Sequence, residues 1–307
     1  MSRKIGIIGM GHVGSTVAHY IVANGFADDL VLIDKNEEKV NSDALDFQDA
    51  MPNLPFHTNI YINDYSALSD ADVIISALGN IDLIKQAHGN DRFAELSNNV
   101  EAVKSVSAKI KKSGFNGVLD VITNPVDVIT SIYQKETGLS KEKVIGTGTL
   151  LDSARMKRAV ADKLNIDPRS VDGYNLGEHG NSQFTAWSTV RVFGEPITNL
   201  VKEKNLDLDA LDRDARDGGF TVFKGKFYTN YGVATAAVKL ANVIISDSKS
   251  QLVVSNYRKD YGVYLSYPAI VGENGIEKQI NLDLTEQELE KLQYSAEFIN
   301  QKFEENK

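Results

Sequence analysis

Short apolar runs alternate with longer helical patterns over the first half of the chain, from Lys4 to about Gly146. Such alternation favours a parallel sheet, because consecutive parallel strands need a crossover connection and right-handed helical crossovers dominate. The pattern therefore predicts an α/β fold of the Rossmann type, in which helices cover both faces of a doubly wound parallel sheet. The runs expected to form its strands are KIGII, LVLID, FHTNIYI, DVIISAL, GVLDVIT and KVIG.

The second half of the chain has shorter strand-like runs between helical stretches. We expect strands around residues 171–176, 184–193, 252–257 and 261–271, and helices near residues 151–164, 208–220 and 233–246. Thr285, followed by Glu288, forms a capping-box pattern ahead of a final amphipathic helix. We therefore expect two domains: a Rossmann domain over residues 1–146, which would bind the cofactor, and a mixed α+β domain over residues 147–307, which would hold the substrate.

Composition excludes several classes of protein. The chain has 307 residues, a formal net charge of −9 and no cysteine, so it has no disulfide framework, no thiolate metal site and no cysteine nucleophile. We expect a cytoplasmic protein and no metal. The sequence contains no run of about 18 apolar residues, so we expect no membrane-spanning helix. An acidic balance without a block of Lys and Arg also argues against nucleic acid or an anionic membrane as the main partner.

A glycine motif follows the first expected strand. Gly9, Gly11 and Gly14 spell G-x-G-x-x-G, which combines a tight turn, a close approach of the backbone to a pyrophosphate and close packing of helix on strand. Asp34 ends the second expected strand, where a carboxylate can accept hydrogen bonds from an adenosine ribose. Because Asp34 would repel a 2′-phosphate and Lys35 is the only basic residue beside it, the motif favours NAD over NADP.

Three further segments narrow the function: TNPVD at residues 123–127, LDSAR at 151–155 and GEHG at 177–180. With the glycine motif and Asp34, they resemble the L-lactate/malate dehydrogenase family along essentially the whole chain. Within that family, GNIDLIKQAHGNDRFAEL, GTGTLLDSARM and GYNLGEHGNSQF are most similar to L-2-hydroxyisocaproate dehydrogenases of lactic acid bacteria. The resemblance implies an NAD-dependent enzyme that interconverts L-2-hydroxy acids and 2-oxo acids.

Reduction of a 2-oxo acid needs a hydride donor, an acid for the new hydroxyl group and a clamp for the carboxylate. His179 is the best candidate for the acid among these segments, since imidazole titrates near neutral pH. The resemblance implies that Asp152 pairs with His179 and that Arg155 binds the substrate carboxylate through its planar fork. The alternative is an ordinary ion pair between Asp152 and Arg155 on a helix surface.

Three more residues take roles from the resemblance alone. Arg92 would lie on a lid that closes over the substrate and polarise the carbonyl oxygen; the alternative is a solvated arginine at a helix start. Asn124 would hydrogen-bond the reacting oxygen or the nicotinamide, although its position before a proline could mark a simple turn. Thr229 would lie beside the substrate side chain, on a looser match.

The expected lid, residues 81–91, bears on the choice of substrate. Malate enzymes usually carry a second cation there, whereas the only cation in this segment is Lys85, among largely apolar neighbours. The segment is also longer than the usual lactate dehydrogenase lid. These features favour aliphatic or branched substrates such as 2-oxoisocaproate, with an L-lactate or malate dehydrogenase proper as the alternative.

Regulation and assembly follow from the resemblance only. Some bacterial relatives bind fructose 1,6-bisphosphate through basic residues that include a histidine; the matching position here is Asp172, so we expect no such activation. A homotetramer or a homodimer is expected. Two other functions share the fold: NAD-dependent glycoside hydrolysis, which uses a metal held by Cys and His, and a non-catalytic NAD sensor. The absence of cysteine argues against the first, and the joint presence of Arg92, Asp152, Arg155 and His179 argues against the second.

Overall fold

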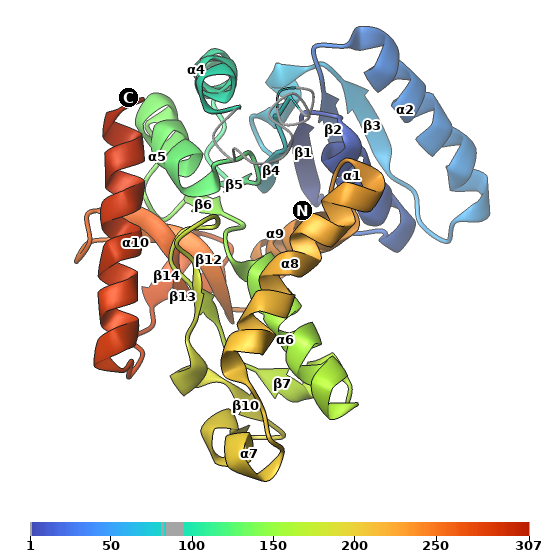
Figure 1. Cartoon of the computed structure of the whole chain (residues 1–307). Helices are drawn as coiled ribbons and strands as arrows, with labels where there is room; N and C mark the ends of the chain where they lie inside the picture. The colour runs from blue at the N-terminus through green and yellow to red at the C-terminus, as the bar shows by residue number, and fades with distance from the viewer. Residues whose placement is uncertain (1, 81–82, 84–94, 307) are drawn as a thin grey trace.

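A nine-stranded sheet runs through the centre of the computed structural model, which describes residues 2–80, 83 and 95–306 (Figure 1). Its strand order is β14-β13-β12-β6-β5-β4-β1-β2-β3. The strands from the first half of the chain are β1 (Lys4–Ile8), β2 (Asp29–Ile33), β3 (Asn59–Ile62), β4 (Val73–Ser76), β5 (Val118–Val121) and β6 (Val144–Gly146). All of them pair in parallel, which confirms the predicted doubly wound sheet.

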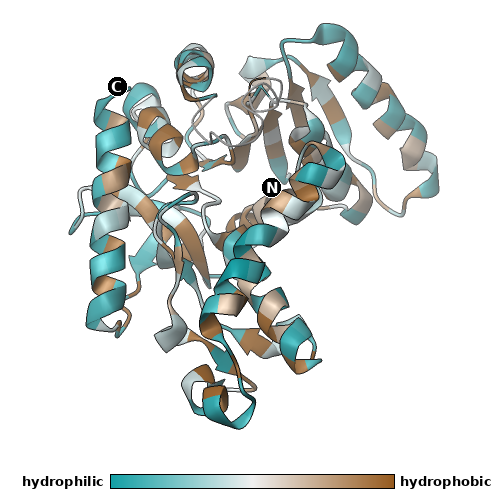
Figure 2. Cartoon of the chain, in the orientation of Figure 1, coloured by the Kyte–Doolittle hydropathy of each residue, from teal (hydrophilic) through white to brown (hydrophobic). Residues whose placement is uncertain are grey.

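Helices cover both faces of this sheet because its central strands are apolar on both sides; every residue of β4 and β5 is buried. One face carries α1 (His12–Asn24), α2 (Glu37–Ala50) and α9 (Tyr231–Ile245). The other carries α4 (Leu96–Ser113), α5 (Val126–Thr137) and α10 (Glu286–Glu304). The hydropathy colouring shows apolar strands at the centre and largely hydrophilic outer surfaces on α2 and α10 (Figure 2).

The second half of the chain extends the same sheet, a continuity that the local sequence pattern does not predict. The strands β12 (Ser250–Arg258), β13 (Val263–Gly272) and β14 (Gly275–Gln279) form an antiparallel ribbon. Ser255 of β12 pairs with Gly146 of β6 and so joins the ribbon to the parallel strands. Both hydrophobic cores that flank the sheet therefore contain residues from both halves of the chain.

A smaller lobe lies below the sheet in Figure 1, around α6 (Leu150–Leu164) and α8 (Leu208–Lys226). It has its own apolar core, which includes Met156, Val160 and Val192. Its remaining strands and helix are β7 (Val171–Asp172), β8 (Asn175–Leu176), β9 (Phe184–Thr185), β10 (Arg191–Val192), β11 (Glu195–Pro196) and α7 (Ile197–Glu203). Short 3-10 helices cover Met51–Asn53, Tyr65–Leu68, Pro168–Ser170 and Trp187–Thr189. This mixed α+β lobe matches the predicted class.

Two expected strands of this lobe are broken into shorter pieces. The run over residues 171–176 splits because Gly173 adopts a φ of 126°, a left-handed conformation that ends β7 before β8 begins. The run over residues 184–193 is interrupted by a 3-10 helix. By contrast, the predicted capping box of the last helix is present: Thr285 Oγ1 accepts from Glu288 N at 3.3 Å, and Thr285 N donates to Glu288 Oε2 at 2.9 Å.

Across residues 2–80, 83 and 95–306, none of the helices combines the length and the apolar character that crossing a bilayer requires.

Asp120, on the central strand β5, is a fully buried carboxyl group. Thr147 Oγ1 donates to its Oδ1 at 2.8 Å, and its Oδ2 has no hydrogen-bond partner among the described residues. Burial raises the pKa of Asp120 from 3.8 to about 8, since the charged form is poorly solvated there. The folded protein therefore favours the neutral acid at neutral pH.

This burial predicts a pH-dependent stability. The unfolded chain releases the Asp120 proton near pH 4 and the folded chain only near pH 8, so the contribution of Asp120 to stability falls as pH rises between those values. Asp120→Asn removes this titration. The unfolding free energy of the variant, relative to the native chain, should therefore increase from pH 5 to 7.5, by at most about 1.4 kcal/mol per pH unit. Urea unfolding at several pH values measures this slope; the exposed Asp49→Asn serves as the control and should show none.

Candidate active site

The glycine motif forms the turn between β1 and α1. Gly9 has a φ of 97°, and a Cβ placed on it would lie 2.7 Å from the carbonyl oxygen of Ala77. A Cβ on Gly14 would lie 1.8 Å from the carbonyl oxygen of Gly9, so these two glycines are required by the packing of the turn itself. A Cβ on Gly11 would meet no atom within 4 Å. Gly11 therefore leaves open space directly at the start of α1.

The surroundings of this turn suit a dinucleotide. Gly11 is the N-cap residue of α1 and provides no side-chain cap, so the first N–H groups of the helix can bind an anion. Asp34 follows β2 and accepts hydrogen bonds from the main-chain N–H of Met10 at 2.6 Å and of Asn36 at 2.8 Å. A carboxylate has about four acceptor positions, which leaves capacity for ribose hydroxyl groups beside the turn. The open space, the free helix N-terminus and this carboxylate fit the phosphates and ribose of NAD.

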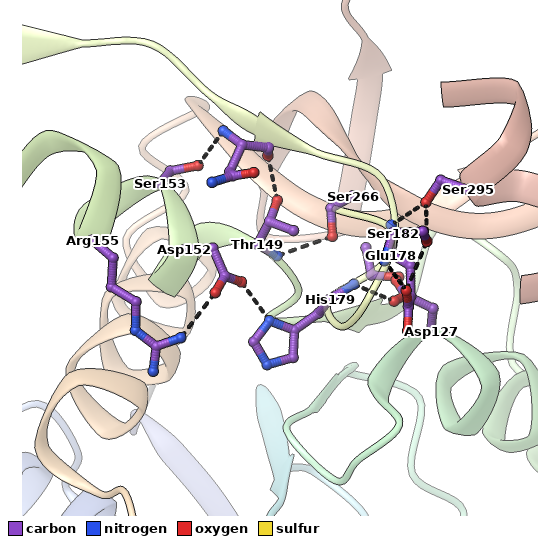
Figure 3. Close-up of polar contacts among 12 residues, drawn as sticks. Asp127, Thr149, Asp152, Ser153, Arg155, Glu178, His179, Ser182, Ser266 and Ser295 are labelled. Atoms are coloured by element: carbon purple, nitrogen blue, oxygen red, sulfur yellow. Dashed lines mark hydrogen bonds and ion pairs between the residues drawn. The ribbon is translucent and has the colours of Figure 1, made fainter. Parts of the chain in front are cut away.

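His179, Asp152 and Arg155 come together in the structure (Figure 3). His179 lies in the loop after β8, and its Nδ1 is hydrogen-bonded to Oδ2 of Asp152, which is buried in the first turn of α6. The other oxygen of Asp152 accepts from Nη1 of Arg155 at 2.9 Å. The expected pair with His179 and the alternative ion pair with Arg155 therefore exist side by side, since each uses a different carboxylate oxygen.

A glycine in α8 makes room for Arg155. A Cβ on Gly219 would lie 3.3 Å from both Cζ and Nη1 of Arg155, so a larger residue would crowd the guanidinium group. The N–H groups of Arg155 that do not contact Asp152 have no hydrogen-bond partner among the described residues. Its guanidinium can therefore bind a carboxylate and keep its contact with Asp152. The helix α8 continues past residue 220, where the local pattern predicted its end.

The loop that carries His179 is fixed to the rest of the protein on its buried side. The main-chain N–H of His179 donates to Oδ2 of Asp127 at 2.8 Å, and Ser255 Oγ donates to Oδ1 of the same carboxyl at 2.6 Å. Burial raises the pKa of Asp127 to about 7. The TNPVD segment stands out in the sequence, but its pattern assigns no role to Asp127. The available signal was a carboxylate within an otherwise apolar start of a helix.

The side chain of Glu178 lies on the buried side of the same loop. It is buried, and its Oε2 accepts from the main-chain N–H of Ser182 at 2.8 Å and from the Ser182 hydroxyl at 2.7 Å. A Cβ on Gly180 would lie 2.0 Å from Glu178 Oε1, so glycine is needed where this carboxyl turns back. Ser295 of α10 accepts from the Glu178 main-chain N–H at 2.7 Å. These contacts fix the GEHG segment to α10.

In the part of the chain that it describes, the structure does not connect the remaining expected site residues to His179, Asp152 and Arg155. Asn124 is exposed between β5 and α5, and its carbonyl oxygen accepts from Asn99 Nδ2 at 2.8 Å. Thr229 is half-buried in the link between α8 and α9. Among residues 2–80, 83 and 95–306, neither side chain hydrogen-bonds to His179, Asp152 or Arg155. Arg92 and Lys85 lie outside the described residues, as does the lid over residues 81–91 apart from Leu83.

Comparison with protein families and known proteins agrees with this geometry. Residues 3–146 match the NAD binding domain of lactate/malate dehydrogenases, and residues 149–307 match the alpha/beta C-terminal domain of the same enzymes. An L-lactate dehydrogenase of Mycoplasma mycoides is 38% identical over 307 residues, covering 97% of this chain and 95% of the relative. One of Priestia megaterium is 36% identical over 308 residues, covering 98% and 95%.

Solved structures give the same result. The ligand-bound minor L-lactate dehydrogenase of Enterococcus mundtii superposes with a TM-score of 0.93 at 33% identity, covering 100% of this chain and 99% of that one. A lactate dehydrogenase from a deep-sea metagenome library superposes with a TM-score of 0.91 at 31% identity, covering 99% of both chains. The cofactor of the first domain is NAD. With both of its halves matched, the chain belongs to the lactate/malate dehydrogenase family.

Proposed function

We propose that this protein is an NAD-dependent oxidoreductase that interconverts L-2-hydroxy acids and 2-oxo acids. The observation that carries the proposal is the double contact of Asp152, which binds the ring of His179 with one oxygen and the guanidinium of Arg155 with the other. A proton donor and a carboxylate-binding group are thereby held in one fixed arrangement. Those are the two protein groups that a 2-oxo acid requires for reduction.

Each of the three residues has a distinct task. Asp152 occupies Nδ1 of His179, so Nε2 is the nitrogen that exchanges a proton with the substrate oxygen. During reduction His179 donates that proton, and during oxidation it accepts the proton of the hydroxyl group. Arg155 holds the substrate carboxylate through two parallel charge-assisted hydrogen bonds. The nicotinamide of NAD, when bound, supplies or accepts the hydride.

The cofactor residues are Gly9, Gly11 and Gly14, which form the pyrophosphate turn, and Asp34, which accepts hydrogen bonds from the ribose. Asn124 acts at the nicotinamide and the reacting oxygen, because it follows the central strand β5 at the carboxyl edge of the sheet. Arg92 polarises the substrate carbonyl, and Thr229 lies beside the substrate side chain. All three of these roles rest on the family resemblance.

For the substrate, we propose a preference for aliphatic or branched 2-oxo acids such as 2-oxoisocaproate. The support is the length of the segment over residues 81–91 and the apolar residues around Lys85, which is its only Lys or Arg. The second candidate is an L-lactate dehydrogenase proper, favoured by the names of the similar proteins from Mycoplasma mycoides and Priestia megaterium. A malate dehydrogenase is the third, and the lack of an arginine in this segment, ahead of Arg92, disfavours it.

Regulation, assembly and location complete the proposal. Asp172 lies 3.7 Å from Lys157, measured from Oδ1 to Nζ, so the position matched to the effector-binding histidine carries an acid paired with a lysine. The negative charge of Asp172 would repel a sugar bisphosphate, which supports the absence of such activation. A homotetramer or homodimer in the cytoplasm remains the expected assembly and location, on the family resemblance and the lack of cysteine.

Two alanine substitutions in the glycine motif should affect different properties: one the affinity for NADH, the other the stability of the fold. Gly11→Ala adds a methyl group to open space, so the unfolding midpoint should stay unchanged while the Kd for NADH rises at least tenfold. Gly14→Ala forces a Cβ against the Gly9 carbonyl and should destabilise the fold itself. NADH fluorescence titration and urea unfolding separate the two effects. Unchanged NADH affinity in Gly11→Ala would contradict the assignment of this turn to the cofactor.

Loss of the proposed proton donor should stop turnover without affecting cofactor binding. His179→Gln should lower kcat by roughly 10²–10⁴-fold, because the side chain can still hydrogen-bond but no longer exchanges a proton at neutral pH. The Kd for NADH should stay within threefold of the native value. The exposed His57→Gln is the control and should retain full turnover. Native-like kcat in His179→Gln would rule out the proposed role.

A substrate panel distinguishes the three candidates. The rate of NADH oxidation should give a kcat/KM that increases from pyruvate to 2-oxoisocaproate, since each additional buried CH₂ contributes about 0.8 kcal/mol, or a few-fold. Oxaloacetate should be the poorest substrate of the three. A maximum at pyruvate would identify an L-lactate dehydrogenase instead. No turnover of any 2-oxo acid would reject the proposed function altogether.

A further inference from the structure

We propose that Asp127 is a positioning residue for the reaction, which holds the main chain of His179 so that the imidazole ring meets Asp152. This inference rests on the proposed function, in which His179 exchanges the proton with the substrate. Asp127 would act through His179 and would not touch the substrate itself.

The geometry shows two carboxyl groups that hold two different parts of one residue (Figure 3). Asp152, at the start of α6, binds the ring through Nδ1, and Asp127, at the start of α5, accepts from the main-chain N–H at 2.8 Å. His179 lies in a loop between two glycines, Gly177 and Gly180, which impose little stiffness of their own. Other contacts hold Gly177 to Ser266 and the main chain of Glu178 to Ser295, and the bond to Asp127 is the one that the main chain of His179 itself donates. This bond therefore fixes the peptide from which the imidazole ring projects.

Asp127 is itself held firmly enough to serve this purpose. Its side chain is buried, and Ser255 Oγ donates to Oδ1 at 2.6 Å, which leaves Oδ2 turned toward His179. Ser255 belongs to β12 and pairs with Gly146 of β6, at the junction inside the nine-stranded sheet. The loop is therefore connected to the central sheet through a chain of two hydrogen bonds.

Asp127 provides a hydrogen-bond acceptor for the main chain of His179, and this role does not require a full negative charge. Burial raises the pKa of this carboxyl to about 7, so a large fraction of the molecules carry it as the neutral acid at neutral pH. An uncharged acceptor of the same shape should therefore replace it. Asparagine meets that requirement, because its Oδ1 can accept from His179 N while its Nδ2 donates to Ser255 Oγ.

Asp120 offers a matched control on the neighbouring strand β5. Both carboxyl groups are buried, and each accepts one hydroxyl hydrogen bond, from Thr147 at 2.8 Å for Asp120 and from Ser255 at 2.6 Å for Asp127. Burial raises the pKa of both groups. Only Asp127 contacts His179. Alanine at either position therefore removes a similar buried group, and any difference in catalysis is due to the contact with His179.

The experiment compares Asp127→Ala, Asp127→Asn, Asp120→Ala and Asp120→Asn in the full chain, with NADH and the best 2-oxo acid of the panel. Asp127→Ala should lower kcat about 10–100-fold, the range expected for a displacement of a catalytic group by about 1 Å. Its KM and its Kd for NADH should stay within threefold of the native values, since Arg155 and the glycine turn are untouched. Asp127→Asn should restore kcat to within about threefold of the native value. Both Asp120 variants should keep native kcat.

The outcomes separate this inference from the proposed function. If the native enzyme reduces no 2-oxo acid, the proposed function fails and this inference with it. If the native enzyme is active and Asp127→Ala loses no more kcat than Asp120→Ala, Asp127 is only a structural residue. Equal loss in Asp127→Asn and Asp127→Ala would also overturn the inference, because the amide keeps the hydrogen bond.

A measurement on the native enzyme covers the case in which Asp127→Ala does not fold. The His179 amide should exchange with deuterium at least tenfold more slowly than the amide of Asn181, which is exposed in the same loop and has no hydrogen-bond acceptor among the described residues. NMR resolves both amides individually. Equally fast exchange would show that Asp127 does not hold the loop, whatever the variants do.

Discussion

The junction between β6 and β12 is the constraint on which the site depends. Gly146, at the end of β6, and Gly148, just after it, let the chain approach β12 and β13. A Cβ on Gly146 would lie 2.9 Å from Cβ of Ser255, and a Cβ on Gly148 would lie 2.3 Å from Oγ of Ser266. Because of this approach, Ser255 reaches Asp127 and Ser266 accepts from the main-chain N–H of Thr149, just before α6. The starts of α5 and α6 are thus held against the C-terminal ribbon.

The loop of His179 is attached to the same ribbon. The main chain of Gly177 forms two hydrogen bonds with Ser266, N to O at 3.0 Å and O to N at 2.9 Å. Glu178 and Ser182, which follow in the same loop, form hydrogen bonds with Ser295 of α10. His179, the proposed proton donor, therefore lies on a segment fixed by β13 and α10, while the glycine turn lies at the carboxyl edge of the parallel strands. Joining the two halves in one sheet brings these parts together.

The local sequence pattern predicted those features that depend on residues close together in the chain, namely the strands and the faces of helices. Apolar runs identified β1 to β6, and the spacing of Asp152 and Arg155 placed both on one face of α6. The pairing of Ser255 with Gly146 could not be predicted in this way, since no local periodicity specifies which distant strand completes a sheet. The role of Asp127 was missed for the same reason, because its partners lie 52 and 128 residues away along the chain.

Three buried carboxyl groups follow one another along β5, α5 and α6, and they differ in the partners that surround them. Asp120 receives a single hydroxyl hydrogen bond, and its pKa rises to about 8. Asp127 receives a hydroxyl and a main-chain N–H, and its pKa rises to about 7. Asp152 alone contacts an arginine, together with a histidine ring. A buried carboxylate is stabilised as an anion by a cation far more than by neutral donors. The two carboxyl groups that have no cationic partner among the described residues therefore have raised pKa values, whereas the one that contacts Arg155 lies beside the ring of His179.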